Sequence, residues 1–303
     1  MKRFRKKVKI FFRNFKTALR RPEMLVLPGQ LAFFFILSIV PTITLIGYGA
    51  GLMNLSTDVI YNFISKAFSN NVADFLIVHP SKTLGMGYLI TMLIGYYFAS
   101  NGAASIIVTS NSIYGLDNTS FMKRRIKAFL MTFVIILLFI FMITVPVFGN
   151  KITEMIAYVN MKQSVTTKIL QVFNFLKGPI TWFIMFLFIK IIYTMAPDKK
   201  TESRHTNKGA IFTTFGWVLS TNIYSYYITH FARYDLFYGS LASIIILMLW
   251  FFLLAYILTI GIALNQKVEE EELEKTSRIE VIKEEIEKDI EEEPKVENKK
   301  KKK

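Results

Sequence analysis

Six long apolar stretches constrain this chain more than any other feature of its sequence. The only charged side chain within them is Lys190, and they cover residues 31–52, 84–112, 128–149, 178–197, 209–229 and 239–265. An α-helix needs about 20 such residues to cross the ~30 Å apolar core of a membrane. The sequence therefore predicts an all-α integral membrane protein with six transmembrane helices, among which 209–229 is the most polar.

Charged residues are concentrated between and beyond these stretches. Of the 22 acidic residues, 14 follow Asn265, so residues 1–265 hold 26 Lys and Arg against 8 Asp and Glu. This distribution argues against a soluble globular enzyme and against a disordered chain. The chain has no cysteine, which removes disulfides, thiol catalysis and thiolate metal ligands. A net charge of +15 fits the basic flanks of membrane spans better than a nucleic-acid partner, which we do not expect.

The connecting segments predict the orientation, because Lys and Arg are enriched on the cytoplasmic side of membrane proteins. Eighteen Lys and Arg lie in the segments on one side and seven in those on the other. The basic group comprises residues 1–30, 113–127 and 198–208, and the other comprises 53–83, 150–177 and 230–238. We therefore expect both termini in the cytoplasm, which agrees with six spans.

The first 22 residues form a basic, amphipathic segment that we expect in the cytoplasm. Its aromatic and aliphatic residues, such as Phe4, Val8, Phe11 and Phe15, recur mainly at helical spacing. This pattern is typical of a helix lying on an anionic leaflet, although charge that only sets the topology would explain it equally well. The cations that would bind the membrane surface are Lys2, Arg3, Arg5, Lys6, Lys7, Lys9 and Arg13.

Two outer segments and the tail also have amphipathic patterns. Residues 56–69 and 164–177 each present one apolar face and predict surface helices, which would roof a cavity, pack on the bundle or sit among the lipid headgroups. Residues 23–265 would form the transmembrane domain. Residues 266–303 would form a charged cytoplasmic tail that is helical at first and then disordered, with isoleucines at spacings of three and four from Ile279.

Residues that could carry catalysis are sparse. The three histidines, His79, His205 and His230, fall in separate connecting segments, and no metal-binding His spacing, nucleophile elbow or phosphate loop is present. We therefore expect no catalytic residues, no metal, no cofactor and no enzymatic activity.

Polar residues within the spans are the remaining candidates for a substrate pathway. Lys190 lies about two turns from the predicted cytoplasmic end of its span, so its ammonium either extends to the interface or faces an anion inside the bundle. The uncharged polar residues either bond neighbouring helices or line a shared cavity, and Pro41 can kink its helix. These candidates are Lys190, Ser38, Pro41, Ser100, Asn101, Asn111 and Asn222.

Several short motifs occur in an order that is familiar from one family. They are Gln30–Pro41, Ser100–Gly102, Asn111–Gly115, Tyr193–Pro197, Tyr238–Ala242 and Gly261–Asn265. Together, over about residues 20–266, the sequence resembles the YihY/BrkB family of bacterial inner-membrane proteins. The resemblance implies a six-span helical protein of the plasma membrane with cytoplasmic termini. The chain departs from the family pattern at Ala263, where many members have Glu, and at Phe33–Phe35, where a Tyr is common.

The resemblance says less about activity than about fold. The family was formerly labelled ribonuclease BN, a label generally regarded as mistaken, and some members are linked to serum resistance or to export of envelope lipids. Our leading hypothesis is a transporter or translocase of an amphiphilic, anionic cell-envelope component, with anionic membrane lipids as partners. The alternative is a non-catalytic scaffold for envelope proteins. We reject the ribonuclease interpretation because the sequence offers no metal or acid–base site.

Overall fold

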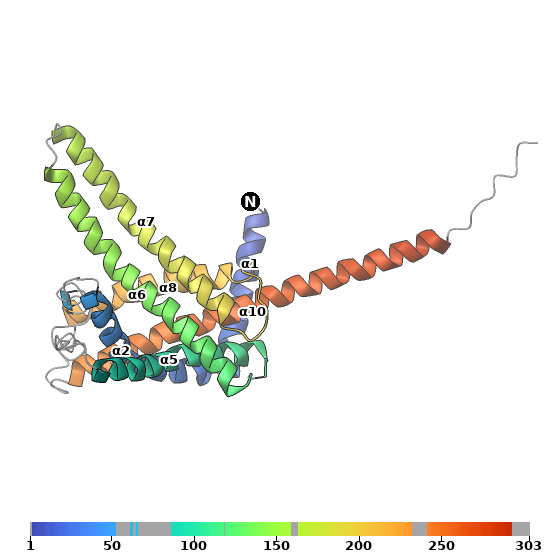
Figure 1. Ribbon diagram of the computed structural model, residues 1–303. Helices are drawn as coiled ribbons and strands as arrows, with labels where there is room; N and C mark the ends of the chain where they lie inside the picture. Colours follow the sequence, from blue (N-terminus) through green and yellow to red (C-terminus); the bar gives the residue numbers. More distant parts are fainter. Residues whose placement is uncertain are drawn as a thin grey trace, which may run out of the picture.

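The computed structural model describes residues 2–52, 61–62, 65, 86–117, 119–158, 163–231 and 241–292. Within these residues the regular structure is a 3-10 helix and seven α-helices (Figure 1). They are α1 (Lys2–Leu19), η1 (Pro22–Leu25), α2 (Leu27–Leu52), α5 (Met86–Tyr114), α6 (Phe121–Tyr158), α7 (Gln163–Met195), α8 (Asn207–Phe231) and α10 (Leu241–Glu292).

The long helices coincide with the apolar stretches of the sequence. Each predicted span lies largely within one of α2, α5, α6, α7, α8 and α10. Among the described residues, three helices are long and apolar enough to cross a membrane, through Met92–Tyr114, Gly178–Met195 and Ile245–Glu284. An all-helical membrane protein is thereby confirmed, while the number of six spans stays a prediction.

Helix α10 lies at the centre of the bundle and packs against α1, α2, α5 and α8. In its first half α10 buries Ala255, Leu258 and Ile262, each at most 2% exposed. Because its surroundings are other helices rather than lipid, 61% of its apolar window is buried, against 22% for α7. Figure 1 shows that α10 then continues as one helix well beyond the bundle.

The packing of α10 on α7 and α8 depends on a close approach at Gly261. The hydroxyl of Tyr193 donates to the carbonyl of Leu258 at 2.9 Å and is 2.5 Å from the hydroxyl of Thr213. A Cβ at Gly261 would clash with both hydroxyl groups. One turn further along α10, the Asn265 Oδ1 accepts the backbone N–H of Gly209 on α8 at 2.7 Å. The Gly261–Asn265 motif therefore sets the contact between these helices.

Helices α6 and α7 form a long pair that leans away from the other helices (Figure 1). The predicted surface helix 164–177 differs here from the structure, because it forms the first half of α7 rather than a separate element. The reason is that its apolar face continues in register into the span, through Val172, Leu176, Ile180 and Phe183, all exposed. The other predicted surface helix, 56–69, lies largely outside the described residues.

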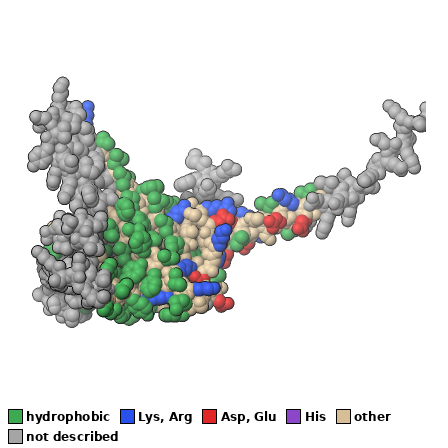
Figure 2. All heavy atoms as spheres, in the orientation of Figure 1, with side chains coloured by type: hydrophobic (Ala, Val, Ile, Leu, Met, Phe, Trp, Pro, Cys, Tyr) green, Lys and Arg blue, Asp and Glu red, His purple; other side chains and the backbone are tan. Residues whose placement is uncertain are grey.

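Charged and apolar side chains separate on the described surface. Figure 2 shows a broad belt of apolar side chains over the bundle, and Lys, Arg, Asp and Glu gathered where α10 leaves it. An exposed apolar belt of this kind is unfavourable in water and is the expected surface against lipid. A boundary between apolar and charged side chains is the pattern expected where a helix bundle leaves a membrane.

Candidate functional site

Polar residues from three helices meet about halfway along α5. We call this group the mid-α5 cluster, and it consists of Ser38, Tyr97, Ser100, Asn101, Gly102 and Arg125. Asn101 lies 13 residues before the end of α5, or ~20 Å along its axis at ~1.5 Å per residue. The cluster is therefore well inside the apolar segment Met92–Tyr114.

Arg125 is the charged member of the mid-α5 cluster. It extends from the second turn of α6 and is 9% exposed. Its Nη1 donates to Asn101 Oδ1 at 2.9 Å, and its Nη2 donates to the carbonyl oxygen of Tyr97 at 2.7 Å. The guanidinium carbon lies 3.6 Å from the centroid of the Tyr97 ring, which is a cation–π arrangement. Arg125 thus cross-links α6 to the middle of α5.

The acceptors of Arg125 are all neutral. Within the described part of the chain, no carboxylate oxygen lies within 4.0 Å of its guanidinium, and its buried Nε has no hydrogen-bond partner. Burial of an uncompensated charge is costly, and ionisable groups among membrane helices are commonly functional. The local chemistry is that of a cation able to receive an anion.

The other members of the mid-α5 cluster tie α2 to α5. The Ser38 hydroxyl donates to the carbonyl of Phe34 at 2.6 Å and accepts the backbone N–H of Gly102 at 2.9 Å. Ser100 is fully buried and donates to the Tyr97 carbonyl at 2.7 Å. Pro41 is one turn along α2 from Ser38, on the side facing Gly95 of α5. Four residues were predicted for a pathway and lie close together here. Ser100 and Asn101 are on α5, and Ser38 and Pro41 of α2 pack against the same stretch of it.

Sequence reasoning missed Arg125. It placed residues 113–127 in a connecting segment and treated Lys190 as the only charge inside the spans. In the structure α6 already begins at Phe121, so Arg125 belongs to the helix and reaches the middle of α5. The apolar pair Phe121 and Met122 before the basic residues was the available signal for this earlier start.

A second polar group, the inner-end network, joins the ends of α5, α6 and α7. Lys127 donates from Nζ to the carbonyls of Ala196 and Pro197, at 2.8 and 2.7 Å, and to Asp198 Oδ1 at 2.6 Å. Asp198 Oδ2 accepts the side chains of Asn111 at 2.7 Å and Thr119 at 2.9 Å. All three ammonium donors are used, and two of them satisfy carbonyls at the end of α7.

The carboxyl group of Asp198 is held ionised by this network. Burial alone would raise its pKa, but the hydrogen bonds from Lys127, Asn111 and Thr119 outweigh burial and lower the pKa from its ordinary value. Its backbone N–H also donates to Asn111 Oδ1 at 2.9 Å. Asn111, predicted for the pathway, thus has a structural role at the end of α5. That helix stops at Gly115, whose φ of 64° provides a left-handed cap.

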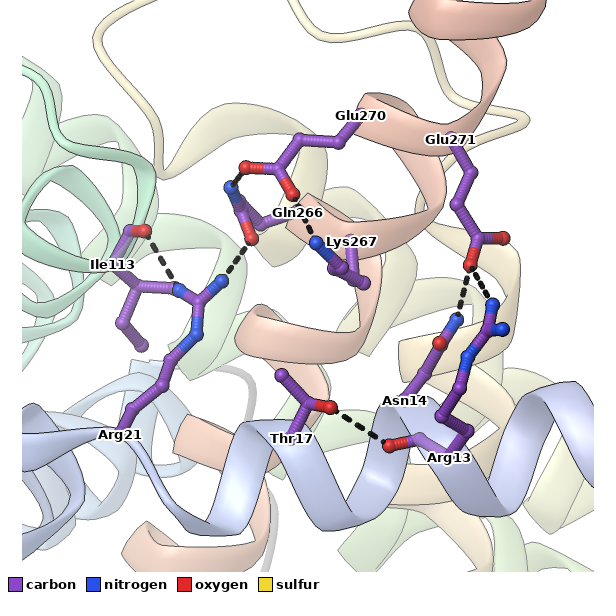
Figure 3. Close-up of polar contacts among 9 residues, drawn as sticks. All are labelled: Arg13, Asn14, Thr17, Arg21, Ile113, Gln266, Lys267, Glu270 and Glu271. Carbon is purple, nitrogen blue, oxygen red and sulfur yellow. Dashed lines mark hydrogen bonds and ion pairs between the residues drawn. The ribbon is translucent and has the colours of Figure 1, made fainter.

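The N-terminal segment is anchored to the start of the tail (Figure 3). Arg21 donates to the carbonyl of Ile113 at 3.1 Å and to Gln266 Oε1 at 2.5 Å, and Gln266 bonds to Glu270 in turn. Asn14 of α1 donates to Glu271 Oε1 at 3.0 Å. Beside these bonds, Phe11 and Phe15 of α1 contact the ring of Phe212 on α8. Helix α1 is therefore bound to protein along one face.

The remaining predicted residues are dispersed. Lys190 is half-buried on α7, and Asn222 is exposed on α8 with its amide bonded to the carbonyl of Val218 in its own helix. Of the predicted membrane-surface cations, Arg5 and Lys9 are exposed, and Arg13 lies 3.4 Å from Glu271 Oε1. The side chains of Lys2, Arg3, Lys6 and Lys7 lie outside the described part of the structure.

Residues suited to metal binding do not gather in the described part of the chain, which contains no group of three or more His, Cys, Asp or Glu positioned for a metal ion. His205 is 6% exposed, and its Nε2 lies 2.8 Å from Glu272 Oε2 on α10. Ala263, where the resemblance associates Glu with many family members, is 1% exposed in the core of α10.

Comparison with known proteins agrees with the motifs. The family profile described as Virulence factor BrkB matches residues 17–281. The chain belongs to the BrkB family. The resemblance inferred from the motifs is thereby confirmed, and the match spans all six long helices and the start of the tail.

Individual relatives carry names that describe location more than activity. The ribonuclease-like protein YfkH of Bacillus subtilis is 27% identical over 243 residues, covering 78% of this chain and 87% of the relative. A UPF0761 membrane protein of Pseudoalteromonas atlantica is 27% identical over 278 residues, covering 87% of each chain. Another from Histophilus somni strain 2336 is 25% identical over 256 residues, covering 80% of this chain and 84% of the relative. No solved structure matches the chain.

Proposed function

We propose that this BrkB-family protein is a translocase for an anionic amphiphile of the bacterial cell envelope. The observation that carries the proposal is that Arg125 and Lys190, both on the long helices, have no carboxylate oxygen within 4.0 Å among the described residues. The six apolar stretches contain no Asp or Glu. An anionic group of a substrate would supply the balancing charge, and cations at such positions commonly mark substrate pathways.

The proposal includes six spans in the plasma membrane with both termini in the cytoplasm. The contacts at one end of the bundle support this topology, because they join the segments richest in Lys and Arg. Arg21 bonds to Ile113 at the end of α5, and Lys199 lies 3.0 Å from Glu269 of α10. Segments 1–30, 113–127 and 198–208 therefore share one end of the bundle with the start of the tail, as the positive-inside rule requires of cytoplasmic segments.

Reconstitution into vesicles tests translocation. The purified protein would be placed in liposomes with a trace of fluorescent phosphatidylglycerol, and a membrane-impermeant quencher would report exchange between leaflets. We expect faster exchange than in empty vesicles, and slower exchange for Arg125→Gln and Lys190→Ala than for the wild type. Arg204→Gln, a change at an exposed cytoplasmic-end residue, is the control and should leave the rate unchanged. Exchange no faster than in empty vesicles, across several anionic headgroups, would contradict the proposal.

A scaffold is the second candidate, and one observation favours it. Beyond its contacts with the bundle, α10 exposes Leu273, Ile279, Ile282 and Ile286, each more than half exposed. An unpartnered apolar stripe on a protruding helix is a typical docking surface for another helix. Deleting residues 273–303 would remove the stripe and keep the contacts of Gln266–Glu272. Unchanged crosslinking partners in native membranes after this deletion would count against the scaffold.

Ribonuclease activity, which the name of one relative mentions, is not part of this proposal. RNA hydrolysis needs a metal site or an acid–base pair near the cytoplasmic face. Metal-dependent cleavage of RNA by the purified protein, lost on mutation of its own residues, would overturn our view that the protein is not an enzyme.

A further inference from the structure

We infer that Arg125 binds the phosphate of an anionic membrane lipid, at a site between α5 and α6 beneath the ring of Tyr97. The inference deepens the proposed function, on which it rests, because it names the residue and the pair of helices that would receive the headgroup. The substrate class that follows is a phospholipid or another phosphate-bearing lipid.

The hydrogen-bonding capacity of Arg125 is the first step. A guanidinium has five N–H donors in a planar fork that matches two phosphate oxygens. Asn101 Oδ1 and the Tyr97 carbonyl each accept from one terminal nitrogen, and both are neutral. Among the described residues, the buried Nε–H has no hydrogen-bond partner. The protein therefore positions the guanidinium without neutralising it, which is the arrangement of a binding residue rather than of a completed ion pair.

The start of α6 adds a second reason to expect an anion. Its first turn contains no acidic residue, and Lys123 and Arg124 directly precede Arg125. Cations near a helix N-terminus are unfavourable, because the helix dipole already places partial positive charge there. Lys127, the fourth cation of this segment, is neutralised by Asp198, and no carboxylate of the described residues pairs with the other three. A phosphate would relieve the unfavourable positive charge that these three produce.

The surface around the site indicates that the phosphate belongs to a lipid. Tyr97, whose ring lies over the guanidinium at 3.6 Å, is 46% exposed, so one of the side chains that cover Arg125 also reaches the outer surface. Ile94 and Phe98 are neighbours of Tyr97 on α5, and Met122 and Ile126 are neighbours of Arg125 on α6. All four side chains are more than half exposed. Acyl chains would contact these apolar side chains while the headgroup reaches Arg125. Free phosphate could use the same charge but gains nothing from the apolar rim.

Equilibrium binding to the full-length protein in detergent tests the inference. The probe is phosphatidylglycerol with a fluorescent acyl chain, and a diacylglycerol with the same fluorophore reports the contribution of the phosphate. We expect Arg125→Gln to weaken phosphatidylglycerol binding by about tenfold or more, the usual consequence of losing a charge-assisted hydrogen-bonded pair. Arg204→Gln is the control, because it removes an exposed cation outside the site, and should change binding by less than about twofold. Equal binding by Arg125→Gln and wild type would overturn the inference.

Two further arms separate the sources of the phosphate and guard against misfolding. If inorganic phosphate binds the wild type through Arg125 and phosphatidylglycerol does not, the lipid assignment is wrong. In the wild type, a lipid with a photoactivatable headgroup should crosslink to peptides containing Tyr97–Asn101 or Met122–Ile126, and crosslinks confined elsewhere would refute the site. Binding without leaflet exchange would keep the site and reject the translocase. Leaflet exchange that is unchanged in Arg125→Gln would keep the translocase and reject the site.

Discussion

Arg125 and Lys127 lie two residues apart on α6 and have opposite surroundings. Lys127 uses all three of its donors on Asp198 and on two carbonyls at the end of α7. Among the described residues, Arg125 has an amide oxygen, a carbonyl oxygen and two aromatic rings as partners, and its Nε bonds to none of them. The inner-end network is thus a closed structural connection, whereas the mid-α5 cluster has capacity for a further anion. Two neighbouring cations on one helix can therefore serve different purposes.

The largest effect on the unfolding free energy should come from disrupting the inner-end network. Asp198→Ala leaves Lys127 part-buried without its counter-ion and removes the acceptor of Asn111 and Thr119. Breaking a buried pair in this way typically costs about 3–5 kcal/mol of unfolding free energy. Denaturant titration in detergent would measure the loss. Arg204→Ala, which removes an exposed ion pair with Glu202, should cost less than about 1 kcal/mol. Equal losses for the two variants would show that the Asp198 network is not a major source of stability.

The inner-end network should also make the stability of the protein depend on pH. Since the folded-state pKa of Asp198 is lowered, its contribution is complete above the ordinary carboxyl pKa of about 3.9 and is lost as pH falls through the folded value. Melting temperatures recorded from neutral pH downward should therefore decline on the acid side. The pKa of Glu270 is also lowered, since its bonds to Lys267 and Gln266 outweigh its burial, so Asp198→Asn should retain a smaller acid-dependent decline. An identical decline in that variant would exclude Asp198 as a cause.

Replacing Arg125 should affect stability much less than replacing Asp198. Arg125→Leu loses hydrogen bonds to neutral acceptors but also removes the cost of burying an unneutralised charge. We expect the unfolding free energy to stay within about 1 kcal/mol of the wild type, because replacing buried charges by apolar groups is often neutral. The titration used for Asp198→Ala measures this directly. A loss as large as that of Asp198→Ala would mean that Arg125 is structural and would remove the contrast between the two cations.

The smallest effect should be the coupling between Arg125 and the ring above it. A double-mutant cycle with Tyr97→Leu and Arg125→Leu isolates the cation–π contact from the other losses. We expect a coupling of about 0.5–1 kcal/mol, because Tyr97 is half exposed. A coupling of zero in unfolding measurements would show that the ring covers the guanidinium without binding it.

The helices could be located from sequence because their signal is local. Long uncharged runs identified all six long helices, and the predicted ends at residues 112 and 197 lie within two residues of the ends of α5 and α7. Register across the bundle could not be obtained in this way. The bond between Lys127 and Asp198 joins residues 71 positions apart, and no periodicity in either segment indicates it. The break expected between 164–177 and its span was wrong because an unbroken apolar face resembles two helices as readily as one.

The candidate site was predicted only in part. Ser38, Pro41, Ser100 and Asn101 were chosen as polar or helix-breaking residues in apolar surroundings, and the structure gathers them on α5. Asn111 was chosen by the same criterion but belongs to the inner-end network. Arg125 was not selected as a candidate, because its positive charge next to a span was counted only as a signal of membrane orientation. An arginine that folds back against the preceding helix carries the same sequence signal as one facing water.

The continuity of α10 has a mechanical consequence. Its 52 residues would extend about 78 Å at ~1.5 Å per residue, from Leu241 through the bundle to Glu292. Because the helix has no loop along this length, it acts as a stiff rod. A lateral force on the protruding part would be transmitted as a torque to Gly261 and Asn265, where α10 meets α7 and α8. Whatever holds the tail would thereby also constrain the alignment of the helices inside the membrane.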